Sequence, residues 1–141
     1  MGQIDGKVAF ITAAGGAIAG ATARLFAKEG AAVCCIDILE KNVLETANDI
    51  NEAGGNAIAL VCDVTDDEAV AKAVEKTVKE FGKLDVCFNA AAYSEKRHRL
   101  AEMPVEMWKN VIDVNLTGMF IVARNVIPKM QATGGGSIIN V

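Results

Sequence analysis

Short apolar runs alternate along the chain with longer segments in which apolar residues recur at helical spacing. The apolar runs, which we expect to be strands, cover residues 7–12, 32–37, 57–62, 84–88 and 137–141. Between them, residues such as Val70, Val74 and Val78 repeat every four positions, which is typical of one face of a helix. Strands joined by such helices cannot form hairpins and indicate right-handed crossovers. The pattern therefore predicts a doubly wound α/β domain with a parallel sheet, strand order 3-2-1-4-5.

Start and stop signals divide the helical segments. Residues 65–68 have the form of a capping box, so we expect the Thr65 hydroxyl to accept the backbone amide of Glu68 at the start of the third helix. A long helical segment begins at about Pro104, and we expect Pro128 to interrupt or end it because proline has no amide hydrogen. We expect one domain over residues 1–141, with the chain ending at the fifth strand.

The composition excludes several classes of partner. The chain has 141 residues, is 52% hydrophobic and carries a formal charge of -4, which argues against a surface for nucleic acid or anionic membranes. No apolar run approaches the roughly 20 residues of a membrane span, and residues 1–6 lack the features of a signal peptide. We therefore expect a soluble, cytoplasmic protein. The four cysteines lie in apolar runs without C-x-x-C spacing, which favours reduced core thiols over a metal site.

The loop after the first predicted strand is rich in glycine. Backbone amides in such a loop, at the start of a helix, can bind a pyrophosphate. The residues expected to do so are Thr12, Ala13, Gly15, Gly16, Ala17 and Ile18.

An acidic residue follows at the distance that a dinucleotide site requires. Asp37 lies 20 residues after Ala17, at the end of the second predicted strand, with Ile38 next to it. A carboxylate there can accept hydrogen bonds from an adenosine ribose and would repel a 2′-phosphate, so NAD is favoured over NADP. The alternative is an ordinary tight turn and a helix-capping aspartate. The agreement of loop, strand and acid favours a Rossmann-type nucleotide site.

The whole chain resembles the short-chain dehydrogenase/reductase family through four motifs in the family's order. They are residues 7–12 leading into the glycine loop, Cys62-Asp63-Val64-Thr65, residues 84–92 and residues 113–118.

The resemblance assigns roles to residues at several strand ends. It implies that Asp63 contacts the adenine amino group and that Val64 lies along the base. It also implies that Asn89, Ala90 and Ala91 line the cofactor.

The resemblance implies that Asn115 holds a water in the proton relay of the reaction. It further implies a small alcohol or ketone substrate and a homodimer or homotetramer.

Three alanines depart from the family's glycine pattern. Ala13, Ala17 and Ala19 stand where the family has glycine, and a side chain at a left-handed turn costs roughly 1–2 kcal/mol. The fourth-strand motif, usually Asn-Asn-Ala-Gly, is Asn89-Ala90-Ala91-Ala92. We expect a cofactor site that these changes could weaken.

The family's catalytic serine, tyrosine and lysine have no counterparts and are expected beyond Val141. Tyr93 is the only tyrosine, and Lys96 follows it by three residues instead of the family's four, in a loop, so we do not take them as the catalytic pair. The sequence thus predicts an NAD(H)-dependent oxidoreductase interconverting a secondary alcohol and a ketone, incomplete relative to a full family member. The alternative is a non-catalytic nucleotide-binding or interaction module.

Two further features have plain interpretations. The basic run of residues 96–99 favours a solvated surface, although it could receive an anionic substrate. The packing face of the long helix is interpreted to consist of Met103, Met107, Trp108, Val111 and Ile112.

Overall fold

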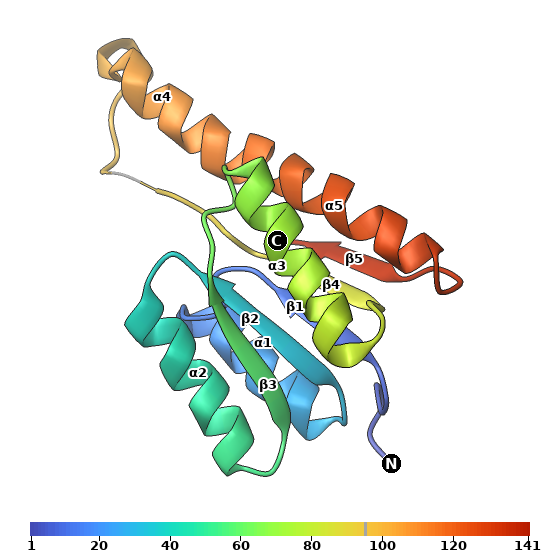
Figure 1. The fold of residues 1–141 in the computed structure, drawn as a ribbon. Helices are drawn as coiled ribbons and strands as arrows, with labels where there is room; N and C mark the ends of the chain where they lie inside the picture. The colour runs from blue at the N-terminus through green and yellow to red at the C-terminus, as the bar shows by residue number, and fades with distance from the viewer. Residues whose placement is uncertain (95) are drawn as a thin grey trace.

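The computed structural model describes residues 1–94 and 96–141, and its centre is a five-stranded parallel sheet (Figure 1). The strand order is β3-β2-β1-β4-β5, which confirms the predicted doubly wound topology. The register pairs Phe10 with Cys34 on one side and with Cys87 on the other. The strands are β1 (Val8–Ile11), β2 (Ala32–Asp37), β3 (Asn56–Val61), β4 (Val86–Asn89) and β5 (Ser137–Asn140).

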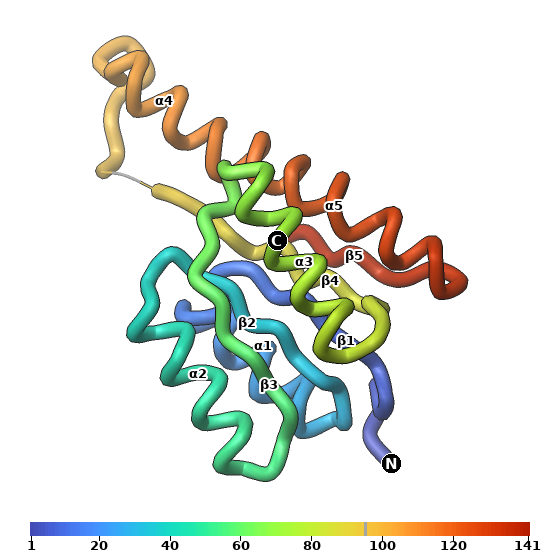
Figure 2. The backbone as a smooth tube through the Cα atoms, in the orientation of Figure 1, coloured from blue at the N-terminus to red at the C-terminus, as the bar shows by residue number. Residues whose placement is uncertain are grey.

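Helices connect the strands, as the apolar spacing predicts. The last three helical segments follow one another without a break and form the long helix that begins after Pro104 (Figure 2). The segments are α1 (Ala17–Lys28), α2 (Glu40–Glu52), α3 (Asp67–Phe81), the 3₁₀ turn η1 (Leu100–Glu102), α4 (Val105–Ile112), the π-helical η2 (Asp113–Gly118) and α5 (Met119–Gln131).

The sheet has a hydrophobic core on each face because consecutive residues of a strand point to opposite sides. Phe10 packs in one core with Val74 of α3 and Val122 of α5, and all three are buried. Its neighbour Ile11 packs in the other core with residues of α1 and α2, such as Val43. The two layers of helices thus hold the strand ends, and the loops that follow them, in fixed positions.

The predicted start of α3 is wrong by one residue. The N-cap is Asp66, whose Oδ1 accepts the backbone amide of Ala69 at 3.0 Å. The Thr65 hydroxyl instead donates to Oδ1 of Asp63 at 2.8 Å, and the Thr65 amide donates to the same oxygen at 2.9 Å. Asp63 therefore holds Thr65 in the loop, and the helix begins after it.

Pro128 does not interrupt the long helix. It lies within α5, which continues to Gln131, and the amide of Ala132 still donates to the carbonyl of Pro128 at 3.2 Å. A proline near the end of a helix removes only one hydrogen bond, which the packing of α5 on the sheet compensates.

The continuous helix is longer and more apolar than we expected from the sequence. The 27 residues of Val105–Gln131 are long and apolar enough, by length and composition alone, to cross a membrane. In the fold, Ile121, Val122 and Val126 of this helix are buried. Part of its apolar character therefore belongs to the core of the α/β domain.

Candidate functional site

The glycine-rich loop leaves β1 through a residue in the left-handed region. Ala13 has φ of 54°, the only positive value at a non-glycine residue in the described part of the chain. The amide of Gly16 donates to the carbonyl of Ala13 at 2.9 Å, and α1 begins at Ala17. A side chain in this conformation costs about 1–2 kcal/mol relative to glycine. The loop thus makes a tight turn in spite of the alanine.

The Asp37 carboxylate connects this loop to the end of β2. Its Oδ2 accepts the backbone amide of Gly15 at 3.0 Å, and its Oδ1 accepts the amide of Leu39 at 2.9 Å. A Cβ on Gly15 would lie 2.6 Å from Cβ of Asn42, so a side chain does not fit there. The first two strand ends are therefore joined through a carboxylate that is partly exposed to solvent.

A second set of bonds joins the ends of β1 and β4. The hydroxyl of buried Thr12 accepts the amides of Ala90 and Ala91, both at 2.8 Å. Asn89 is also buried, and its Nδ2 donates to the carbonyl of Met119 at 3.0 Å. These bonds position the loop after β4 against both β1 and the long helix.

A hollow of about 290 Å³ lies at these strand ends and is open to solvent. Six of the predicted cofactor-binding residues line it, namely Ala13, Asp37, Ile38, Asp63, Val64 and Ala91. Five further residues line it that the sequence reading had not assigned to the cofactor: Leu39, Cys62, Ala92, Tyr93 and Val114. The types of these five residues do not indicate ligand binding in the sequence. They line the hollow only because the folded loops bring them together.

The remaining predicted residues lie outside this wall. Thr12 and Asn89 are buried behind it and make the hydrogen bonds described above. Gly15, Gly16, Ala17, Ile18 and Ala90 do not line the hollow. Ile18 is 69% exposed on the first turn of α1. The loop amides and the hollow nevertheless occupy the same end of the sheet, where ligands of doubly wound folds bind.

Asn115 lies in the π-helical turn of the long helix. Its Oδ1 accepts the amide of Tyr93 at 2.7 Å, and its Nδ2 donates to the carbonyl of Tyr93 at 3.1 Å. Such turns widen a helix and occur frequently at functional sites. Asn115 and Tyr93 also line a second hollow, of about 490 Å³, beside the first.

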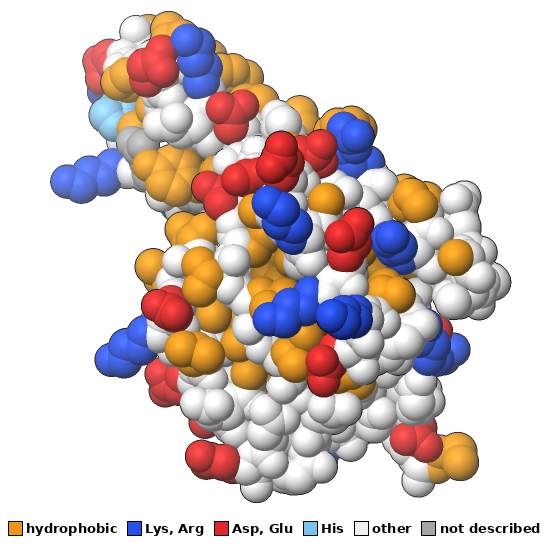
Figure 3. Space-filling model, viewed as in Figure 1, with side chains coloured by type: hydrophobic (Ala, Val, Ile, Leu, Met, Phe, Trp, Pro, Cys, Tyr) orange, Lys and Arg blue, Asp and Glu red, His pale blue; other side chains and the backbone are white. Residues whose placement is uncertain are grey.

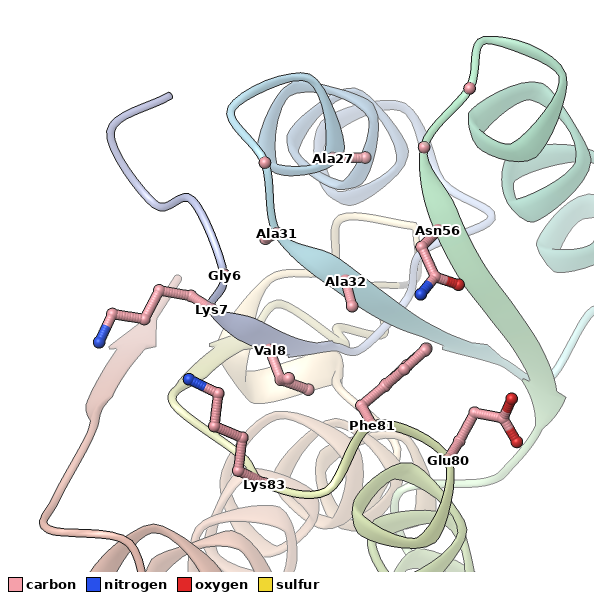
Figure 4. Close-up of a pocket in the computed structure, with 13 residues that line it drawn as sticks. Gly6, Lys7, Val8, Ala27, Ala31, Ala32, Asn56, Glu80, Phe81 and Lys83 are labelled. Atoms are coloured by element: carbon pink, nitrogen blue, oxygen red, sulfur yellow. The ribbon is translucent and has the colours of Figure 1, made fainter. Parts of the chain in front are cut away.

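A third hollow, of about 500 Å³, opens at the opposite, amino ends of the strands (Figure 4). Lys7 and Lys83 border it, but both ammonium groups pair with Asp85, at 3.7 and 3.0 Å. The Val8 amide also donates to Asp85 at 2.9 Å. Burial opposes ionisation of Asp85, yet the hydrogen bonds from Lys83 and Val8 hold its pKa below the usual 3.8. The ion pairs of Asp85 therefore connect the segments at the amino ends of β1 and β4. None of the predicted cofactor-binding residues lines this third hollow.

The parallel sheet of order β3-β2-β1-β4-β5 with its connecting helices defines an α/β protein with a Rossmann-like fold. The family model for short chain dehydrogenases matches residues 7–141, and the chain belongs to this family.

Relatives with known names are dehydrogenases and reductases. The chain is 38% identical over 135 residues to cis-4-hydroxycyclohexanecarboxylate dehydrogenase of Sinomonas cyclohexanicum, covering 96% of the chain and 54% of the relative. It is 36% identical to an NAD-dependent glycerol dehydrogenase of Listeria innocua, covering 98% of the chain and 53% of the relative. The chain thus spans about half the length of these relatives.

Solved structures agree with this assignment. A crystal structure of NAD⁺-bound xylitol dehydrogenase superimposes with a TM-score of 0.93 at 35% identity, covering 96% of the chain and 52% of that protein. A hydroxysteroid dehydrogenase from Escherichia coli gives a TM-score of 0.90 at 30% identity, covering 96% and 57%.

Proposed function

We propose that the chain is the cofactor-binding part of an NAD(H)-dependent oxidoreductase that interconverts a secondary alcohol and a ketone. Residues 1–141 would form the dinucleotide-binding domain, and the catalytic serine, tyrosine and lysine would lie in the portion of the family's length that the chain does not span. The observation that carries the proposal is the Asp37 carboxylate at the rim of the 290 Å³ hollow, tied to the glycine loop through Gly15.

The residues present fit an adenosine and a pyrophosphate. Asp37 can accept hydrogen bonds from the ribose hydroxyls, and its charge would repel a 2′-phosphate. Asp63, on the same wall, can accept from the adenine amino group, while Val64 offers an apolar surface to the base. The backbone amides of the first turn of α1 would bind the pyrophosphate. Bound NAD would supply the hydride-transfer chemistry, and these residues would orient it.

Asn115 is our candidate catalytic residue. Its side-chain amide is bonded to the backbone of Tyr93, so this bond fixes the π-helical turn against the loop after β4. The Oδ1 atom and the backbone carbonyl of Asn115 retain lone pairs with which they can hold a water for proton transfer.

We also propose a small alcohol or ketone substrate, a cytoplasmic location and a homodimer or homotetramer. The names of the relatives that act on glycerol, cyclohexanol and xylitol support an alcohol substrate. Large apolar side chains on the exposed side of the long helix support self-association. They are Val105, Trp108, Leu116, Phe120 and Ile127.

The cofactor proposal is tested by calorimetric titration with NADH and NADPH. We expect NADH to bind at least about tenfold more tightly, since a carboxylate beside a 2′-phosphate costs a kcal/mol or more. Asp37→Asn should reduce this preference, because it removes the charge and retains one acceptor. Glu45→Gln on α2 is the charge-matched control and should preserve it. Tighter binding of NADPH by the unmodified protein would contradict the proposal.

The second candidate is a nucleotide-binding or interaction module without hydride transfer. The strained Ala13, at φ of 54°, favours it because a side chain stands at the turn that approaches the pyrophosphate. Incubating the full-length protein with NAD⁺ and a panel of secondary alcohols distinguishes the two. NADH absorbance at 340 nm should appear for the enzyme, whereas binding without any turnover supports the module.

A further inference from the structure

A glycine of the long helix lies against the wall of the candidate cofactor site. Gly118 is buried at the end of η2 and has ordinary helical dihedral angles, φ of -61° and ψ of -41°. This conformation does not require glycine, and alanine is the better helix former. The reason for a glycine at this position is therefore the space around it.

That space is occupied by the side chain of Val64. A Cβ on Gly118 would lie 2.7 Å from Cγ2 of Val64, and 3.4 Å from both Cβ of Val64 and the carbonyl oxygen of Asp113. Carbon atoms in good contact are about 3.5–4.0 Å apart, so the shortest of these distances is a clash and the others are close to ordinary contacts. One methyl group of Val64 therefore excludes a side chain at Gly118.

Val64 lies between Gly118 and the place proposed for the adenine base. It lines the 290 Å³ hollow, and only 5% of it is exposed. Val114, one turn before Gly118, lines the same hollow. The long helix and the loop after β3 thus form one wall together, and the contact at Gly118 sets how far Val64 projects into the hollow.

The long helix is held on both sides of Gly118. On the amino side, Asn115 forms two hydrogen bonds with the backbone of Tyr93. On the carboxyl side, the buried side chain of Asn89 donates to the carbonyl of Met119 at 3.0 Å. Because a close-packed interior transmits a displacement, extra volume at Gly118 would displace the neighbouring side chain rather than the helix.

The segment that carries Val64 is also tied to the long helix. Acidic side chains gather where the start of α3 meets this helix (Figure 3), and Asp67 and Glu68 lie in the first turn of α3. Oδ1 of Asp67 accepts Nδ2 of Asn125 at 2.9 Å, and its Oδ2 lies 3.6 Å from a guanidinium nitrogen of Arg124. With both backbones held, the free space beside the Val64 side chain is the hollow.

We propose that Gly118 is a positioning residue of the cofactor site, because its missing side chain keeps Val64 out of the space for the adenine base. The helix that carries the candidate catalytic Asn115 thereby also sets the width of the adenine hollow. The identity of the ligand in this inference rests on the proposed function. The packing of Gly118 on Val64 is independent of it.

Calorimetric titration of the full-length protein with NADH tests the inference. Gly118→Ala should raise the Kd about fivefold or more, because the added methyl group pushes Val64 into the hollow. Val64→Ala removes part of the wall and should raise the Kd about twofold. The two substitutions combined should give a Kd within about twofold of Val64→Ala alone, since the clash is absent. Thr117→Ala, exposed in the same turn, is the control and should change the Kd less than about twofold.

The two halves of the cofactor separate a local effect from a general loss of structure. AMP contains the adenosine half and reduced nicotinamide mononucleotide the other half, and NMR titration measures even weak binding of each. Gly118→Ala should weaken AMP by about the same factor as NADH and change the Kd of the mononucleotide less than about twofold. Hydrogen exchange at the Tyr93 amide should stay the same, because the helix does not move.

Any one of four results would overturn the inference. They are an unchanged Kd for NADH in Gly118→Ala, a loss of affinity that persists beside Val64→Ala, equal weakening of the two halves, and faster exchange at the Tyr93 amide. If Gly118→Ala alone does not fold, the double variant decides by its Kd relative to Val64→Ala. An unmodified protein that binds neither NADH nor AMP contradicts the proposed function. Binding of both without an effect of Gly118→Ala contradicts only this inference.

Discussion

The side-chain amide of Asn115 forms two hydrogen bonds with the backbone of Tyr93, one at its amide and one at its carbonyl. The side chain of Asn115 thus makes the pair of backbone hydrogen bonds to Tyr93 that a neighbouring strand would otherwise make. This pairing fixes Tyr93 between the two hollows at the carboxyl end of the sheet.

Replacing Asn115 by alanine should remove two hydrogen bonds from the backbone of Tyr93. We expect a loss of about 1–2 kcal/mol in the free energy of unfolding, because two backbone groups lose their partners. Hydrogen exchange at the Tyr93 amide should become faster, which NMR or mass spectrometry can measure. Asn110→Ala, one turn earlier and exposed, is the control. Unchanged protection of the Tyr93 amide in Asn115→Ala would show that the bonds do not hold in solution.

The Thr12 hydroxyl accepts two backbone amides in the interior. Thr12→Val should therefore cost about 2–4 kcal/mol, since the amides of Ala90 and Ala91 lose their acceptor. Thr12→Ser retains the acceptor and should cost less. Thr22→Val, at a half-buried site on α1 where the hydroxyl donates to the carbonyl of Ile18 in the same helix, should have a smaller effect. Urea denaturation measures all three, and similar losses for Thr12→Val and Thr22→Val would contradict the prediction.

Ala13 adopts a conformation that glycine tolerates better. Ala13→Gly should stabilise the fold by up to about 1 kcal/mol, after the greater entropy of glycine in the unfolded chain is subtracted. It should also tighten NADH binding. Ala19, another alanine at a family glycine position, is buried within α1, and Ala19→Gly should destabilise by about 1 kcal/mol. Thermal unfolding measures the change in stability for both variants. The prediction requires that Ala13→Gly stabilise the fold and Ala19→Gly destabilise it, and changes of the same sign would contradict it.

Burial makes the cysteines weak acids in the folded chain. It raises the pKa of Cys34, Cys35 and Cys87 from 9.0 to about 12, and that of Cys62 to about 11. Because the folded pKa lies above the unfolded one, this contribution to stability is full below pH 9 and is lost as the pH rises from 9 toward 12. Iodoacetamide at pH 8 should leave the native chain unmodified and alkylate all four thiols in concentrated urea. Rapid native alkylation would show that a thiol is accessible.

The fold could be predicted from the spacing of apolar residues along the sequence. Both faces of a parallel sheet must be covered, and the apolar spacing of the helical segments indicates which side of each helix packs on the sheet. Local hydrogen bonds were harder to predict. Thr65 and Asp66 are both good N-cap residues, and the structure selects Asp66 because Asp63 already engages Thr65.

The sequence indicates a candidate site residue where the residue type has one chemical use. It does not indicate residues that line the site only because of the shape of the folded loops. The place of Asp37 at the end of the second strand could be predicted from the sequence, but nothing in the sequence shows that Tyr93 would line two hollows.

The bond between Asp37 and Gly15 has a consequence for protein engineering. The carboxylate that would discriminate between the two cofactors also anchors the loop that would hold their phosphates. Exchanging Asp37 for a small neutral residue, to admit a phosphorylated ribose, would also release this anchor. A redesign of cofactor preference must therefore supply a new acceptor for the Gly15 amide, so selectivity and loop order have to be changed together.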